Sequence, residues 1–270
     1  MQQDDFLESA KTVALKAGLF VKSHLSERHD IQRKSKYDFV SEVDQQSELI
    51  IRTYLAEKYP DHLFFGEEEI SSNPIGEDEI ISRLPKDRYV WVIDPVDGTT
   101  NFLRGIPQFA ISIALVKDEK VILGVVYDIS LDELYFAKVG EGAFCNGRPI
   151  HVAGTDKLDD FIVSTSFPAA KVEARGQVLR VIDCNKLDFT SLRIWNCASL
   201  AITYVATGRT DAHIELGIHL WDFAAGKVIA EEAGGCFSDV DGKPFHLYQK
   251  HVLVSNGKLH NQIVERICSK

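Results

Sequence analysis

Apolar residues recur every three or four positions over residues 6–20, and the same spacing returns over residues 41–57. Such spacing places the apolar side chains on one face of an α-helix. Ser41 with Asp44 three residues later has the form of a capping box, with Asp in place of the usual Glu. We therefore expect the chain to open with two amphipathic helices.

Five short runs rich in β-branched and aromatic residues follow the predicted helices. They lie at residues 63–65, 89–93, 109–116, 121–128 and 133–139. Such runs, bounded by polar residues, are typical of strands. Polar turns at 117–120 and around Ser130 join the last three, which predicts an antiparallel meander.

Strands and helices alternate after the turn at Asn146-Gly147. We expect strands at 161–167, 191–195 and 210–216, helices at 169–183, 198–207 and 222–233, and then the strands CFSDV and VLVS and a final helix. This alternation favours a layered α/β arrangement. The chain thus divides near residue 148 into an α+β half (1–148), with the antiparallel sheet, and an α/β half (149–270). No linker composition separates the halves, so we expect them to pack as one unit.

Charge and composition narrow the classes of function. The chain has 270 residues, is 45% hydrophobic and 26% charged, and has a net charge of −10. This acidity argues against general nucleic-acid binding, which depends on basic patches. Apolar runs are too short for a membrane span, and the N-terminus lacks a signal-peptide pattern, which predicts a cytoplasmic protein. Five scattered cysteines without a CxxC pair predict neither a disulfide framework nor a zinc site.

Acidic residues gather at three points beside predicted strand ends or helix starts. Residues 67–69 alone would be read as a solvated loop, and Asp222 alone as a helix cap. Asp94 and Asp97 are harder to dismiss, because Pro95 between them fixes a turn in which both carboxylates and the Val96 carbonyl can converge. Hard oxygen donors of this kind suit Mg²⁺.

A glycine and two threonines follow these carboxylates directly. Gly98 permits close approach of the backbone to an anion, and Thr99 and Thr100 begin a predicted short helix whose N–H groups can hold a phosphate. Carboxylates that bind divalent cations beside such N–H groups predict a site for metal-assisted phosphoryl transfer to water.

The segments IDPVDGTTNF, GEEE and WDFAAGKVIAEEAGG resemble the inositol monophosphatase family of magnesium-dependent, lithium-sensitive phosphatases. The resemblance covers nearly the whole chain and extends to KSKYDFVSEVD (34–44) and ATGRTDAHIELGIHLWD (206–222). It implies a layered αβαβα sandwich of the sugar phosphatase type, a homodimer, and a phosphoric monoester hydrolase acting on inositol monophosphates or a similar polyol phosphate.

The resemblance also implies a metal-binding set. Glu67, Asp94 and the Val96 carbonyl would hold one Mg²⁺, and Asp94, Asp97 and Asp222 a second, with Asp94 bridging. A third, weaker ion would sit on Glu67 through water, and Mn²⁺ is expected to substitute for Mg²⁺.

Further residues receive roles by the same resemblance. Glu67 and Thr99 would orient the attacking water, with Asp44 hydrogen-bonded to Thr99. The Gly98 and Thr99 N–H groups would bind phosphate, with Thr100 a further candidate. Substrate hydroxyls would meet Asp97, Glu215 and the Ala198 N–H. Lys34 lies in a segment that would cover the site, or is a surface lysine. His213 is expected to serve strand packing and His219 a structural role.

One departure from the family pattern concerns residues 196–198. Asn196-Cys197-Ala198 stands where members commonly have Gly-Ser-Ala or Gly-Thr-Ala, and we expect this to alter substrate preference without touching a metal ligand. Fructose 1,6-bisphosphate, histidinol phosphate, nucleotide 3′-phosphates and NADP remain alternative substrates. A regulatory scaffold that binds protein or RNA is the alternative of another class. A calcium module is disfavoured because the spaced acidic loop of an EF-hand is missing.

Overall fold

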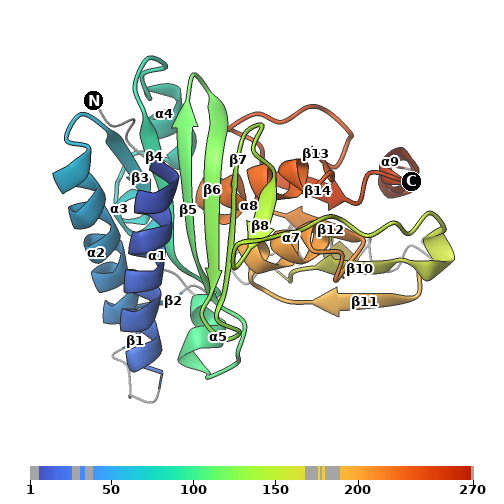
Figure 1. Cartoon of the computed structure of the whole chain (residues 1–270), viewed down its shortest axis with the longest axis horizontal. Coiled ribbons are helices and arrows are strands. Elements are labelled where there is room, and N and C mark those ends of the chain that lie inside the picture. The colour runs from blue at the N-terminus through green and yellow to red at the C-terminus, as the bar shows by residue number, and fades with distance from the viewer. Residues whose placement is uncertain are drawn as a thin grey trace.

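Two β-sheets with a pair of helices between them form the centre of the structure (Figure 1). The computed structural model describes residues 6–25, 31–33, 39–167, 176, 178–179 and 189–268. No helix among these residues is long and apolar enough to cross a membrane.

The two predicted N-terminal helices are present as α1 (Phe6–Ser23) and α2 (Glu42–Lys58). Between them, the structure describes a small antiparallel pair of strands, β1 (Ile31–Arg33) and β2 (Phe39–Ser41). The Ser41 side chain, half of the predicted capping box, lies outside what the structure describes. The buried face of α2 is unusual because it includes polar residues, namely Asp44, Ser47 and Glu48.

A seven-stranded sheet follows in the order β3-β4-β5-β6-β7-β8-β9. Its strands are β3 (Leu63–Gly66), β4 (Val90–Asp97), β5 (Ala110–Lys117), β6 (Lys120–Asp128), β7 (Glu133–Lys138), β8 (Ala143–Cys145) and β9 (Arg148–Pro149). The predicted antiparallel meander is confirmed, whereas β3 pairs in parallel with β4. The prediction that the strand at 89–93 ends before Asp94 is wrong, because β4 continues through a register shift to Asp97.

Three short helices flank β3 and β4 along the chain. They are α3 (Glu67–Ser71), α4 (Glu77–Ser82) and α5 (Thr99–Leu103). Only α5 was expected. The first turns of α3 and α4 carry three acidic residues each, which favours helix starts. The run 67–69 is therefore a helix N-terminus rather than a solvated loop, and the run 77–79 also begins a helix.

The second sheet has the order β11-β10-β12-β14-β13. Its strands are β10 (Ile162–Thr165), β11 (Ser191–Ile194), β12 (Ala212–Leu216), β13 (Cys236–Ser238) and β14 (His251–Ser255), after a 3₁₀ turn η1 (Leu158–Asp160). The helices are α7 (Ala198–Ala206), α8 (Leu220–Glu232) and α9 (His260–Cys268). The helix predicted over 169–183 falls almost entirely outside the described residues.

Three hydrophobic cores hold five layers together. Trp91 and Ile93 of β4 pack with α1 and α2, whereas Val92 packs with α7, α8 and the inner face of the second sheet. A third core joins the outer face of that sheet, including Ile214, to α9. Figure 1 shows these layers side by side. The predicted αβαβα sandwich is confirmed, while the division near residue 148 stays a prediction.

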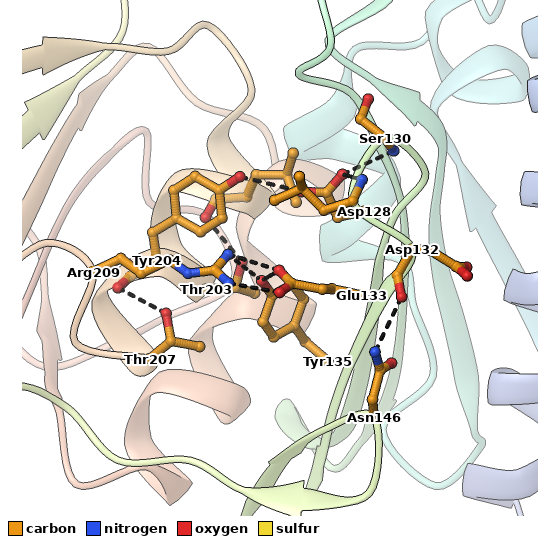
Figure 2. Close-up of polar contacts among 12 residues, drawn as sticks. Asp128, Ser130, Asp132, Glu133, Tyr135, Asn146, Thr203, Tyr204, Thr207 and Arg209 are labelled. Atoms are coloured by element: carbon orange, nitrogen blue, oxygen red, sulfur yellow. Dashed lines mark hydrogen bonds and ion pairs between the residues drawn. The ribbon is translucent and has the colours of Figure 1, made fainter.

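Polar contacts also join the seven-stranded sheet to α7 and the turn after it (Figure 2). Arg209 donates from Nη2 to Glu133 Oε1 at 2.6 Å, and from Nη1 to Glu133 Oε2 at 2.7 Å and to the Tyr135 hydroxyl at 2.8 Å. Tyr204 donates to the buried Asp128 carboxylate at 3.1 Å. Such bidentate and charge-assisted bonds fix the helical layer against β6 and β7.

Candidate active site

A bulge in β4 shapes the centre of the site. In a regular strand, residues four apart point to the same face, but Val92 packs toward α7 and α8 while Val96 packs toward α1 and α2. The register shifts between Asp94 and Asp97. Asp94 Oδ1 accepts a hydrogen bond from the Val96 N–H at 3.0 Å, and Ser47 donates to the Pro95 carbonyl at 3.0 Å. The turn is thus fixed from within and from α2.

Four carboxyl groups from three segments meet at this bulge. Burial raises the pKa of Asp94 well above its usual range, and the charges of Glu67, Asp97 and Asp222 raise it further. A side-chain hydrogen bond between Asp94 and Glu67 acts on the Asp94 pKa in the same direction. Burial and the charge of Asp97 likewise raise the pKa of Asp222. The structure therefore brings together Glu67, Asp94, Asp97 and Asp222.

This cluster has the chemistry of a cation site. The main causes of the raised Asp94 pKa are burial and other carboxyl groups, and no cationic side chain is among them. In the described part of the chain, no group of three or more His, Cys, Asp or Glu side chains is already arranged to hold a metal ion. Since carboxylates bind metal only when deprotonated, a bound cation would lower the raised pKa of Asp94. The oxygen-only donor set fits a hard divalent cation.

Asp97 is anchored by the start of α7. Its Oδ2 accepts hydrogen bonds from the Ser199 N–H at 2.7 Å, the Ser199 hydroxyl at 2.6 Å and the Cys197 thiol at 3.3 Å. Burial raises the pKa of the Cys197 thiol well above its usual range, so it stays a donor. The expectation that Cys197 touches no proposed metal ligand is wrong, because the turn before α7 places the thiol against Asp97. The role of Ser199 went unpredicted.

Glu67 is positioned by a buried acid on α2. The Glu48 carboxylate accepts the Glu68 N–H at 2.8 Å and the Glu69 N–H at 3.3 Å, which caps α3. A Cβ at Gly66 would lie 2.5 Å from the Glu48 carboxyl carbon, so a larger residue there would displace the carboxylate that caps this helix. Glu68, expected to be a solvated loop residue, is partly buried in α3. Glu48 carried no motif in the sequence that would have revealed its role.

Thr99 and Asp44 lie as the resemblance implies. The Thr99 hydroxyl lies 3.0 Å from Asp44 Oδ1 and 3.1 Å from the Val96 carbonyl, and its single hydrogen serves one of these at a time. Asp44 is fully buried. Gly98 has φ +87°, and a Cβ there would lie 2.7 Å from the Gln108 carbonyl. Glycine is therefore required where the backbone turns into α5.

Two acids, Asp222 and the largely buried Glu77, fix the start of α8. Asp222 Oδ2 accepts the His219 N–H at 2.8 Å, while Glu77 accepts the Leu220 N–H at 3.1 Å and lies 2.7 Å from both His219 Nδ1 and Lys250 Nζ. Burial raises the pKa of Glu77, but the bonds to His219 and Lys250 outweigh it and lower the pKa to about 2. The His219 ring also stacks on Trp221. The predicted structural role of His219 is thus visible in these contacts. No motif in the sequence marked Glu77.

The remaining predicted residues differ in their placement. Glu215 is buried on β12, and its charge contributes to the raised pKa of Asp222. Ala198 is buried as the first residue of α7, and Thr100 is exposed on α5. Lys34 lies outside the described residues. His213, expected only to pack, is hydrogen-bonded to Glu215 at 3.1 Å.

Comparisons with known proteins cover the chain nearly end to end. The model of the inositol monophosphatase family matches residues 2–270. Inositol monophosphatase 1 of Bos taurus is 36% identical over 270 residues, covering 98% of this chain and 93% of that protein. The Nus factor SuhB of Pasteurella multocida is 34% identical, covering 97% and 95%. The crystal structure of extragenic suppressor protein suhB from Bartonella henselae superposes with a TM-score of 0.87 at 32% identity, covering 97% and 98%.

Proposed function

Because the chain belongs to the inositol monophosphatase family, we propose that it hydrolyses inositol monophosphates, or a similar polyol phosphate, to the free alcohol and inorganic phosphate. The observation that carries this proposal is the meeting of four carboxyl groups from three distant segments around Asp94, where the pKa values of Asp94, Asp97 and Asp222 are raised. Such a cluster is costly unless cations neutralise it. The family is generally Mg²⁺-dependent, and Mg²⁺ is the proposed cofactor here.

The proposed ligands are Glu67, Asp94, the Val96 carbonyl, Asp97 and Asp222, for two Mg²⁺, with a third ion near Glu67. When bound, Mg²⁺ would supply the charge that activates water and stabilises the leaving oxygen. Thr99 and Glu67 would orient the water, and Asp44 holds the Thr99 hydroxyl in place at 3.0 Å.

Phosphate would lie against the start of α5. Gly98 turns the backbone at φ +87° there, and the N–H groups of Gly98 and Thr99 take part in no hydrogen bond among the described residues. Free N–H groups beside neutralised carboxylates suit an anion. Thr100 is a weaker candidate because it is exposed.

The substrate alcohol would lie between β12 and α7. Glu215 and Asp97 would accept hydrogen bonds from its hydroxyl groups, and the Ala198 N–H would donate. All the hydrogen bonds that the Asp97 carboxylate accepts from the described residues fall on Oδ2, so Oδ1 remains for substrate or metal. A carboxylate pair of this kind favours a polyol over an alcohol without neighbouring hydroxyls.

Phosphate release from a panel of esters tests the proposal. The panel contains myo-inositol 1-phosphate, fructose 1,6-bisphosphate, 3′-phosphoadenosine 5′-phosphate, histidinol phosphate and NADP, each with and without Mg²⁺. We expect Mg²⁺-dependent turnover, highest for the inositol ester, and a loss of more than about 100-fold in Asp94→Asn with the fold retained. Near-normal turnover in Asp94→Asn would contradict the proposed site. Preference for another ester would reassign the substrate within the family.

A second candidate function is that of a regulatory scaffold binding protein or RNA. One similar protein, from Pasteurella multocida, is named a Nus factor. The net charge of −10 disfavours broad RNA binding by this chain. A scaffold without catalysis would release no phosphate from any ester in the panel. We also propose that Li⁺ inhibits the enzyme, that the protein resides in the cytoplasm and that it forms a homodimer. A dimeric mass in solution would support the homodimer.

A further inference from the structure

Two polar residues face inward from β12, on a strand surface that would ordinarily be apolar. Ala212, Ile214 and Leu216 point to the outer core of the second sheet. Since side chains alternate along a strand, His213 and Glu215 point together toward the layer of α7 and α8. The His213 side chain is fully buried, and that of Glu215 is 7% exposed. Buried polar side chains on one face require specific partners.

His213 has one such partner on each ring nitrogen. Its Nε2 lies 3.1 Å from Glu215 Oε2. Its Nδ1 lies 3.0 Å from the hydroxyl of Ser164, the residue of β10 that pairs with His213. A carboxylate has no hydrogen to give, so Nε2 is the donor. The Ser164 hydroxyl also lies 3.3 Å from the Ala212 carbonyl. The ring is thus held at Nδ1 by Ser164 and at Nε2 by Glu215.

The second oxygen of Glu215 has no hydrogen-bond partner within the described part of the chain. Oε1 accepts no hydrogen bond from the described residues, whereas Oε2 accepts that of His213. Glu215 is also near enough to Asp222 for its charge to raise the pKa of that group. Glu215 Oε2 is therefore fixed by His213, whereas Oε1 is available beside the carboxylate cluster.

We propose that His213 is a positioning residue that fixes the Glu215 carboxylate for recognition of a substrate hydroxyl, and so sets the preference for polyol phosphates over simple phosphate esters. This rests on the proposed function. Without the Nε2–H bond, the Glu215 side chain would be free to rotate about its terminal bonds. Substrate binding would then have to fix the Glu215 side chain in one conformation. This entropic cost weakens substrate binding rather than the chemical step.

The test compares two substrates on the same protein preparation. Myo-inositol 1-phosphate presents hydroxyls beside the ester, and phenyl phosphate presents none. The ratio of their kcat/KM values does not depend on the fraction of folded protein, so a partly unfolded variant still reports. We expect His213→Phe, which keeps a ring of similar size, to raise KM for the inositol ester about tenfold, the scale of one charge-assisted hydrogen bond. Its kcat, and both constants for phenyl phosphate, should change less than about twofold.

Two further variants separate positioning from packing. His213→Gln retains an N–H donor and should restore much of the ratio lost in His213→Phe. In a Glu215→Gln background, His213→Phe should have little additional effect on the ratio, because the two residues act as one unit. Additive effects, or a failure of His213→Gln to restore the ratio, would show that His213 only fills the core.

The outcomes for the wild type distinguish the two levels of proposal. If the wild type prefers the inositol ester and His213→Phe shows the same ratio of kcat/KM values, the role of His213 alone would be overturned. A wild-type protein that shows no preference for the inositol ester would overturn both the polyol assignment and this inference.

Discussion

At the scale of residues, the site depends on neutral donors that hold charged groups. Ser199 and Cys197 place three hydrogen bonds on one oxygen of Asp97, and Asp44 accepts one from Thr99. Hydrogen bonds to a charged group are stronger than those between neutral groups. Orientation of the proposed ligands is therefore fixed before any cation arrives.

Removal of one such donor should weaken cation binding. We expect Ser199→Ala to raise the Mg²⁺ concentration needed for half-maximal phosphate release by about tenfold, because partners that orient metal ligands commonly contribute that much. The measurement is phosphate release against Mg²⁺ concentration.

Cys197→Ser is the matched control for this prediction. Serine keeps a donor near Asp97 Oδ2, where the thiol lies at 3.3 Å, so the Mg²⁺ requirement should change by less than about threefold. An unchanged requirement in Ser199→Ala would show that Asp97 needs no anchoring from α7.

At the scale of elements, helix N-termini surround the carboxylates. The helices α3, α5, α7 and α8 begin at Glu67, Thr99, Ala198 and Leu220, and the partial positive charge of a helix N-terminus stabilises nearby anions. Two acids outside the cluster, Glu48 and Glu77, accept backbone N–H groups at the starts of α3 and α8. The position of each helix is thus set from its first turn.

Glu77 makes the start of α8 sensitive to acid. Its pKa falls from 4.5 to about 2 on folding, so its contribution to stability is complete above pH 4.5 and is lost as the pH falls toward 2. We expect the difference in unfolding free energy between wild type and Glu77→Gln to shrink by about 3 kcal/mol over that range. Urea unfolding at several pH values measures it.

Asp78→Asn is the control for Glu77→Gln. Asp78 contacts the same Lys250 at 2.9 Å, but its side chain is 67% exposed. Its loss should therefore change the free energy of unfolding by no more than about 0.5 kcal/mol at any pH. A Glu77→Gln difference that stays constant across the acid range would contradict the assignment of this group.

At the scale of the whole molecule, the periodicity of the sequence predicted the layers. The amphipathic helices α1 and α2, the meander β5 to β7, and the alternation around α7 and α8 followed from local patterns. The parallel pairing of β3 with β4 and the continuation of β4 to Asp97 did not, because register and bulges depend on contacts between strands. The motifs likewise indicated the four carboxylates but not the groups that hold them. Glu48, Glu77 and Ser199 act through contacts between distant segments, which no spacing along the chain reveals. His213 lies only two residues from Glu215, but its contact with Ser164 depends on the pairing of β10 with β12.

Diffraction from crystals soaked in Mn²⁺ with inorganic phosphate tests the metal site most directly, since the anomalous signal locates each ion. We expect at least one ion within about 2.5 Å of oxygens from Asp94 and from two or more of Glu67, Asp97 and Asp222, with phosphate beside Gly98. Fully ordered carboxylates with no anomalous peak among them at millimolar Mn²⁺ would contradict a metal-dependent phosphatase site at this bulge.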